Sequence, residues 1–142
     1  MYEDTLSHVD LFANLNKKEL QALARACQER HYSAGTTIVS QGDSGVGLYV
    51  IESGKVRITH AGNADRAEEE LGTAGAGEVL GEMSLLDDLP RSATMTAIED
   101  VTALLLPIWE FRTVLQNHPD ISVKLLSVLS RRLRKAENRR HE

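Results

Sequence analysis

The sequence has a single cysteine, Cys27, so no disulfide can form within the chain, and a metal or iron–sulfur site made of cysteines alone is excluded. Aromatic residues make up only 4% of the chain, so any core must be aliphatic. Apolar runs such as residues 103–106 are too short to span a membrane as a helix. The acidic N-terminus does not resemble a signal peptide, and these absences together predict a cytoplasmic protein in a reducing compartment.

The sequence also lacks a pattern of catalytic or metal-binding residues. Its five histidines are scattered, with no pair at the spacing of metal ligands, and no nucleophile and base are recognisable as a pair: His8, His31, His60, His118 and His141. We therefore expect no metal site, no catalytic residue and no cofactor.

What remains is the composition of one globular domain over residues 1–142, with 42% hydrophobic and 26% charged residues. The net charge of −5 argues against nucleic acid as a partner of the whole surface. Residues 128–142 nevertheless carry six basic and two acidic side chains. We interpret this segment as a solvated helix end whose cations suit the helix dipole. An acidic protein or nucleic acid is the alternative partner.

The chain is organised as helix, strands and helix. An N-terminal helical segment is expected at about residues 3–28, with Asn16 as N-cap and Glu19 three residues later. Leu20, Leu23, Ala24 and Cys27 follow at the spacing of one apolar helix face. We expect Cys27 to be a small core residue on that face.

Short runs rich in Val, Ile, Thr and Tyr alternate with glycine between about residues 30 and 107. The predicted strands are Thr36–Val39, Gly47–Ile51, Lys55–His60, Ser92–Ala97 and Val101–Leu106. Gly54 fits a tight hairpin between two of them, and the polar stretch Gly62–Glu70 fits an exposed loop. This pattern predicts a mainly β fold with flanking helices, in the form of a β-roll or jelly-roll barrel.

Helical patterns return after Pro107 and fill about residues 108–140. A short helix is expected at Trp109–Leu115, and a long one from Pro119 to about Arg140. The long helix carries two apolar stripes: Ile121, Leu125 and Val128, and then Leu126, Leu129, Leu133 and Ala136. Either the helix is deeply packed, or one stripe faces a ligand or a partner chain.

Chemistry concentrates in the segment from Gly77 to Thr94. Gly81 permits an unusual backbone angle, and Glu82–Leu86 is long enough for one helical turn with outward N–H groups. Arg91 and Ser92 follow where the chain can fold back over this turn. An arginine fork matches two phosphate oxygens, and a carboxylate at Glu82 accepts from a hydroxyl. The combination suits a sugar phosphate, while the simpler alternative is a surface salt bridge between Glu82 and Arg91.

The same residues resemble the phosphate-binding cassette of cyclic nucleotide-binding domains, found in catabolite activator protein, protein kinase A regulatory subunits and cyclic-nucleotide-gated channels. The resemblance rests on Gly81-Glu82-x₈-Arg91-Ser92-Ala93-Thr94 and on the upstream run Gly35-Thr36-x-Ile38-x₂-Gln41-Gly42-Asp43-x-Gly45-x₂-Leu48-Tyr49-Val50-Ile51-x₂-Gly54-x-Val56. It extends over about residues 6–130.

The resemblance implies a role for each matching residue. Arg91 would pair with the cyclic phosphate, and Glu82 would accept the ribose 2′-hydroxyl. Backbone N–H groups near Gly81, Glu82, Met83, Ser92 and Ala93 would complete the anion shell, and Val79 and Leu80 would form an apolar wall. A residue of the last helix would cap the base, the candidates being Leu125, Leu129, Arg131 and Arg132.

The implied function is a receptor for a cyclic purine nucleotide, which signals through its C-terminal helix. Serine at position 92 does not decide between cAMP and cGMP, and we expect cAMP. The alternatives are an interaction module that has lost its ligand, or the sensor domain of a larger transcription regulator, channel or enzyme. A cupin-like metal enzyme is disfavoured by the histidine pattern. A protein partner or a second copy could dock on the C-terminal helix.

Overall fold

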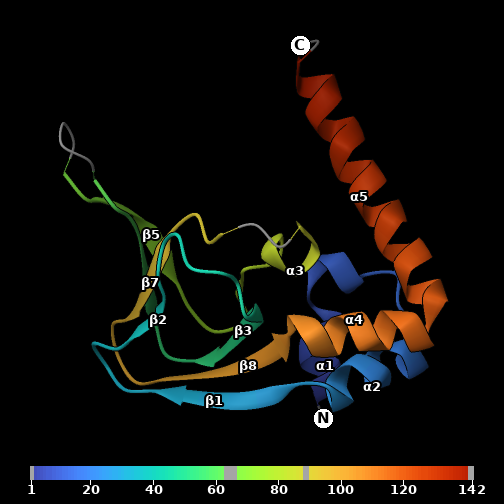
Figure 1. The fold of residues 1–142 in the computed structure, drawn as a ribbon, viewed down its shortest axis with the longest axis horizontal. Coiled ribbons are helices and arrows are strands. Elements are labelled where there is room, and N and C mark those ends of the chain that lie inside the picture. Colours follow the sequence, from blue (N-terminus) through green and yellow to red (C-terminus); the bar gives the residue numbers. More distant parts are fainter. Residues whose placement is uncertain (1, 63–66, 88–89, 141–142) are drawn as a thin grey trace. The chain divides into compact units, whose positions relative to one another are not determined.

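The computed structural model describes residues 2–62, 67–87 and 90–140 (Figure 1). The chain divides into two compact units. One unit is Cys27–Ile108 and contains every strand of the described residues. The other joins Met1–Ala26 to Trp109–Glu142 and is helical.

The strand unit consists of two antiparallel four-stranded sheets. The first has the order β1-β8-β3-β6, formed by Gln28–Tyr32, Val101–Pro107, Gly47–Ser53 and Val79–Leu80. The second has the order β2-β7-β4-β5, formed by Thr37–Val39, Thr94–Ala97, Val56–His60 and Glu69–Ala74. The predicted mainly β fold with flanking helices is confirmed, although the described strands form two sheets and not a closed barrel.

Three of these strands, β1, β5 and β6, were absent from the sequence prediction, and all three lie at sheet edges. β1 and most of β5 are exposed, so their residues lack the alternation of apolar and polar side chains that marks a half-buried strand. β6 has only two residues. The predicted loop Gly62–Glu70 is wrong at its end, because Glu69 and Glu70 belong to β5. Its residues 63–66 lie outside the described residues.

Both sheets contribute to one aliphatic core. The central strands β3 and β8 supply half of its ten buried residues, namely Tyr49, Ile51, Val101, Ala103 and Leu105. Tyr49 lies in this core at 4% exposure, and its hydroxyl is 3.4 Å from that of Tyr32. The low aromatic content is therefore consistent with a core made chiefly of Val, Ile, Leu and Ala side chains.

The turn between β3 and β4 depends on Gly54, as the sequence predicts. Its φ is +94°, which strains any residue with a Cβ. A Cβ there would also lie 2.9 Å from the Cα of Val101 on β8. Glycine is therefore required both for the turn and for the close approach of the neighbouring strand.

The N-terminal part of the helical unit contains α1 (Tyr2–Ser7), the 3₁₀ turn η1 (Asp10–Phe12) and α2 (Lys17–Arg25). The predicted capping box at the start of α2 is confirmed. The Glu19 N–H donates to Asn16 Oδ1, and the Asn16 N–H donates to Glu19 Oε1, both at 2.9 Å. Leu20, Leu23 and Ala24 form its buried face.

Cys27 lies beyond this helix, which ends at Arg25, so its predicted place on the helix face is wrong. The residue is half-buried. Burial raises the pKa of Cys27 to about 12, so the thiolate, which is the reactive form, is scarce at neutral pH.

The C-terminal part contains α4 (Ile108–Asn117) and α5 (Pro119–Arg140), close to the predicted bounds. Ile121, Leu125 and Val128 on the first stripe of α5 are buried. On the second stripe, Leu126 and Leu133 remain 65% and 61% exposed. Of the two interpretations of this helix, the structure favours the one in which a stripe is left open.

Two ion pairs tie α5 to the N-terminal segment within the helical unit. Lys124 Nζ is 2.6 Å from Glu19 Oε1, and Arg132 Nη2 is 2.6 Å from Asp10 Oδ2. The rings of Phe12 and Phe111 add an apolar contact, with their centroids 6.5 Å apart. α5 is thus held at its second and fourth turns by residues that are distant in sequence.

Candidate functional site

The chemistry-bearing segment starts with β6 and continues through a short helix to β7. The helix, α3, is Ser84–Asp87, and it follows a turn in which Gly81 has a φ of +78°. The Leu85 N–H donates to the Glu82 carbonyl at 3.3 Å, so the predicted single turn begins about where expected. Leu85 is 1% exposed and α3 packs on β3, which anchors the turn to the first sheet.

Arg91 is almost fully buried, at 4% exposure. Its backbone is held by the loop after β2, since its N–H donates to the Asp43 carbonyl at 2.9 Å and its carbonyl accepts from the Gly42 N–H at 2.8 Å. Its side chain donates from Nη2 to the Gly47 carbonyl. Nε is buried and has no hydrogen-bond partner among the described residues.

Glycines leave the space that the guanidinium occupies. A Cβ on Gly81 would lie 2.6 Å from Arg91 Cζ and would overlap Nη1. A Cβ on Gly45 would lie 3.3 Å from Arg91 Nε and 3.0 Å from the Ser84 Cβ. The turn after β6 and the loop before β3 are therefore both shaped around this one side chain.

The Arg91 guanidinium is buried, and no ion pair joins it to a carboxylate of the described residues. Burial lowers the pKa of Arg91, and the weaker influence of Tyr49 acts in the opposite direction. An arginine remains charged in proteins, so Arg91 is a buried cation that has, among the described residues, one neutral acceptor and an unpaired Nε–H. Such a group is stabilised most by an anion with oxygens in the plane of the fork. The predicted alternative, a surface salt bridge with Glu82, does not suit a side chain this deeply buried.

Comparison with known proteins identifies the family. The family profile described as "Cyclic nucleotide-binding domain" matches residues 29–118. The chain belongs to the cyclic nucleotide-binding domain family.

Individual relatives agree with this assignment. The "Cyclic AMP receptor protein" of Thermus thermophilus is 40% identical over 89% of this chain and 58% of its own length. A "cAMP-dependent protein kinase regulatory subunit" of Debaryomyces hansenii is 36% identical over 75% of this chain and 22% of its own length. The chain therefore spans well under two thirds of these curated relatives.

A solved structure matches over nearly its whole length. The N-terminal domain of a transcriptional regulator from Streptomyces coelicolor A3(2) is 35% identical, covers 95% of this chain and 96% of its own, and superimposes with a TM-score of 0.86. The relatives described above are regulatory proteins, in line with the expected regulatory character of this cyclic nucleotide-binding domain.

The structure places the predicted cassette residues of this domain as follows. The Arg91 guanidinium lies directly beside Gly81, within contact distance. Glu82 and Val79 are half-buried, and Met83 and Ser92 are exposed. Leu80 and Ala93 are buried, and Leu80 belongs to the aliphatic core. The cassette thus combines a buried cation with two exposed residues, Met83 and Ser92.

The four candidates for the base cap lie on α5, in the helical unit. Leu125 is 3% exposed, and Arg132 pairs with Asp10. Leu129 is half-buried and Arg131 is exposed. Leu125 and Arg132 are thus engaged within their own unit, whereas Leu129 and Arg131 have accessible surface.

Two glycines that position Arg91 were not singled out from the sequence as site residues. Gly47 supplies the carbonyl acceptor, and a Cβ there would lie 2.9 Å from the carbonyl carbon of Leu106 on β8. Gly45 borders Arg91 Nε. Gly45 belongs to the quoted family pattern, so the sequence offered a signal for it. Position 47 is unspecified in that pattern, and Gly47 was assigned only to the predicted strand Gly47–Ile51.

Within residues 2–62, 67–87 and 90–140, no group of three or more His, Cys, Asp or Glu side chains is arranged to hold a metal ion. Over the same ranges, no helix combines the length and apolar character needed to cross a membrane.

Proposed function

We propose that this chain is a receptor for a cyclic purine nucleotide, in which Arg91 binds the cyclic phosphate. The observation that supports this most is the buried guanidinium, which finds one neutral acceptor, and no partner for Nε, in the part of the chain that the structure describes. A cyclic phosphate carries one negative charge on two oxygens, which matches the arginine fork. An exposed, hydrated guanidinium would not require glycine at the positions that surround it here, where a Cβ would crowd the side chain.

With the cyclic phosphate on Arg91, we assign the remaining cassette residues the following roles. Glu82 accepts the ribose 2′-hydroxyl, because an ionised carboxylate can only accept. Backbone N–H groups around Gly81, Met83, Ser92 and Ala93 complete the anion shell. Val79 forms the apolar wall beside the sugar, with Leu80 behind it in the core. No cofactor takes part.

The proposed ligand is cAMP in preference to cGMP. Ser92 does not decide the base, so the preference rests on the relatives. Both the Thermus thermophilus receptor and the Debaryomyces hansenii subunit carry cyclic AMP in their names. For the base cap we propose Leu129, which is apolar and only half-buried.

Ligand binding is transmitted to α5. The phosphate neutralises Arg91 and draws the turn at Gly81 and α3 toward it, which moves Leu85. A ligand shifts such an equilibrium only by binding one state better than the other. The expected readout is a change in amide exchange of residues 119–140 when cAMP is added. Unchanged protection there, with cAMP bound, would contradict transmission through α5.

The output of this signal is open to two proposals. One is a larger regulator of transcription, a channel or an enzyme, because the chain spans little more than half of the Thermus thermophilus relative. The other is docking of a second copy on α5, because Val123, Leu126 and Leu133 are 65%, 65% and 61% exposed at heptad-compatible spacing. An interaction module that has lost its nucleotide is the competing function, and the buried Arg91 speaks against it.

The deciding experiment is thermal unfolding of the wild type, Arg91→Gln and Arg57→Gln, each without ligand, with cAMP and with cGMP. Arg57 is an exposed arginine on β4, so its variant makes the same chemical change away from the site. Ligand at about 100 times its Kd adds roughly 2.7 kcal/mol, which at this size raises Tm by roughly 5–10 °C.

We expect this rise for the wild type and Arg57→Gln with cAMP, a smaller one with cGMP, and none for Arg91→Gln. No rise for the wild type with either nucleotide would favour the interaction module. An equal rise in Arg91→Gln would show that the nucleotide binds elsewhere.

A further inference from the structure

The surface of the helical unit has an open cavity of about 280 Å³, whose lining residues come from both ends of the chain and are exposed except for Val128 and Arg132. Asp10, Ala13 and Asn14 contribute from η1 and the turn after it, and the rest come from α5. None of the residues that surround Arg91 takes part. The volume is at the small end of the range for ligand pockets.

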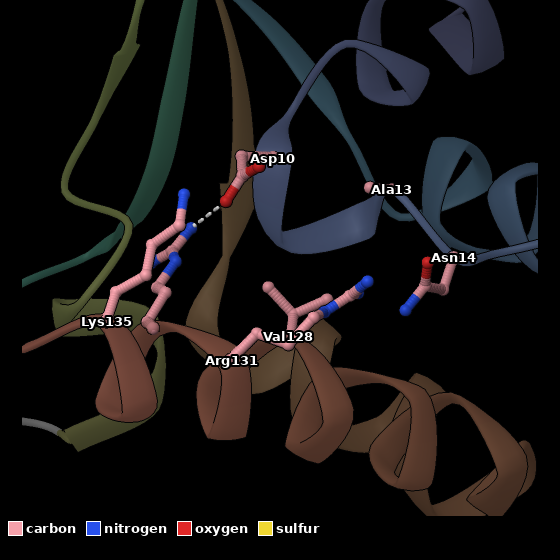
Figure 2. A pocket seen from close by; sticks show the side chains of 7 residues that line it. Asp10, Ala13, Asn14, Val128, Arg131 and Lys135 are labelled. Atoms are coloured by element: carbon pink, nitrogen blue, oxygen red, sulfur yellow. Dashed lines mark hydrogen bonds and ion pairs between the residues drawn. The ribbon is translucent and has the colours of Figure 1, made fainter. Parts of the chain in front are cut away.

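Positive charge dominates the cavity wall. Arg131, Arg132 and Lys135 all line it from α5, against the single carboxylate of Asp10. Arg132 is committed to that carboxylate, with Nη2 2.6 Å from Oδ2. Figure 2 shows Arg131 extending from α5 toward Asn14, while Lys135 extends toward Asp10.

The cations of this wall repel one another. Arg131 and Lys135 are four residues apart on one helix face, where like charges destabilise a helix. No ion pair joins either of them to a described residue. An anion between them would remove the repulsion and would find further donors in the Asn14 amide. Ala13 and Val128 add an apolar part to the lining, which suits a compact organic group next to the charge.

We propose that this cavity is a second ligand site, for a small molecule that carries at least two phosphate charges. Arg131 and Lys135 bind the phosphate oxygens, and Arg132 remains with Asp10. Arginine matches phosphate as a planar fork, which favours phosphate over a single carboxylate. Because its walls belong to η1 and α5, an occupied site joins the same two elements as the Asp10–Arg132 pair, and it holds the basic half of α5 against the N-terminal segment.

The test is calorimetric titration of inorganic pyrophosphate into the full chain carrying Arg91→Ala, at an ionic strength of about 0.15 M. The Arg91→Ala background removes the phosphate site proposed above. Two further variants are made in it: Arg131→Gln with Lys135→Gln, and Arg134→Gln with Arg139→Gln. Both pairs remove two charges from α5, but only the first pair lines the cavity.

We expect one saturable site, weakened about tenfold or more by the first pair and little changed by the second. Citrate in place of pyrophosphate is expected to bind more weakly. If pyrophosphate binding does not saturate, or if both pairs of substitutions weaken it equally, the proposed site is overturned and the attraction is a diffuse one to a basic helix. Tighter binding of citrate would overturn the assignment to phosphate.

Circular dichroism of every variant shows whether the helices are still folded. The single variant Lys135→Gln removes one proposed contact with a smaller change to α5, so loss of binding can be told apart from loss of folding. The result is also independent of the cAMP proposal. Failure of the wild type to bind cAMP would leave pyrophosphate binding in the Arg91→Ala background intact. Failure of pyrophosphate to bind would leave the cAMP-induced rise in Tm intact.

Discussion

Replacing Gly81 by alanine should abolish the proposed phosphate contact although Arg91 itself is not substituted. The added Cβ would overlap Arg91 Nη1 and lie 2.6 Å from Cζ, so the guanidinium must leave its position. Gly81 also has a φ of +78°, where a residue with a Cβ is strained. Two effects are therefore combined in one substitution, and a control must separate them.

Gly77→Ala is that control. Gly77 has a φ of +87°, close to that of Gly81, but a Cβ there meets nothing within 4 Å. Its N–H bond to the Ile51 carbonyl, at 2.7 Å, is retained by alanine. The strain of a positive φ costs about 1–2 kcal/mol, partly offset by the lower entropy of the unfolded chain. Gly77→Ala should therefore lose about 1 kcal/mol of unfolding free energy. Gly81→Ala should lose at least as much, because displacement of the Arg91 guanidinium is added to the same strain.

The affinity for cAMP should distinguish the two variants. Hydrogen bonds to a charged group contribute about 1.5–3 kcal/mol, so displacing Arg91 weakens binding by about 10- to 150-fold. Urea unfolding measures the first quantity and isothermal titration calorimetry the second. Gly77→Ala should bind cAMP as the wild type does. If Gly81→Ala binds cAMP as tightly as Gly77→Ala, the fit of Arg91 into the space left by Gly81 is irrelevant to binding, and the reasoning is refuted.

Two further predictions concern the helical unit. Burial acts to raise the pKa of Glu19, but hydrogen bonds from Lys124 and from the Asn16 N–H outweigh it and leave the pKa lowered. The resulting stabilisation is complete above the unfolded pKa near 4.5 and is lost as the pH falls through the lower folded value. Glu19→Gln should therefore cost about 1–3 kcal/mol in urea unfolding at pH 7 and progressively less below pH 4.5, whereas the exposed Glu99→Gln should cost nothing at either pH. A cost of Glu19→Gln that does not change with pH would contradict this cause. For α5, Leu126→Glu with Leu133→Glu should convert a dimer to a monomer in sedimentation equilibrium without lowering Tm at low protein concentration, because both side chains are exposed within the chain. A wild type that is monomeric throughout would exclude docking of a second copy on α5.

Local patterns in the sequence were reliable wherever a residue acts on its immediate neighbours. The capping box at Asn16 and Glu19, the positive φ at Gly54 and the start of α5 at Pro119 all follow from interactions within a few residues. The strands that were predicted are those with a buried face, because burial imposes alternation on the sequence. The edge strands β1 and β5 are mostly exposed, and their sequences do not alternate between apolar and polar residues.

The candidate site divides in the same way. Gly81 and Arg91 were found from the residues themselves, since a glycine turn and an arginine ten residues later have a recognisable chemistry. Their contact across that separation, and the Gly47 carbonyl that accepts from Arg91, arise only when the loop before β3 is folded against the segment before β7. Cys27 shows the opposite error, because a helical spacing was continued two residues past the end of α2.

The amino-acid order alone was sufficient for the fold class, the main helices and the choice of Arg91 as the candidate for a phosphate contact, because each depends on short-range periodicity or on residue chemistry. Only the tertiary structure decided that Arg91 is buried with an unpaired Nε, and that one stripe of α5 is covered while the other is open. It also decided that the basic half of α5 shares a cavity with the turn around Asp10. Burial and the pairing of distant charges are properties of packed surfaces, and a linear pattern does not specify which surface meets which.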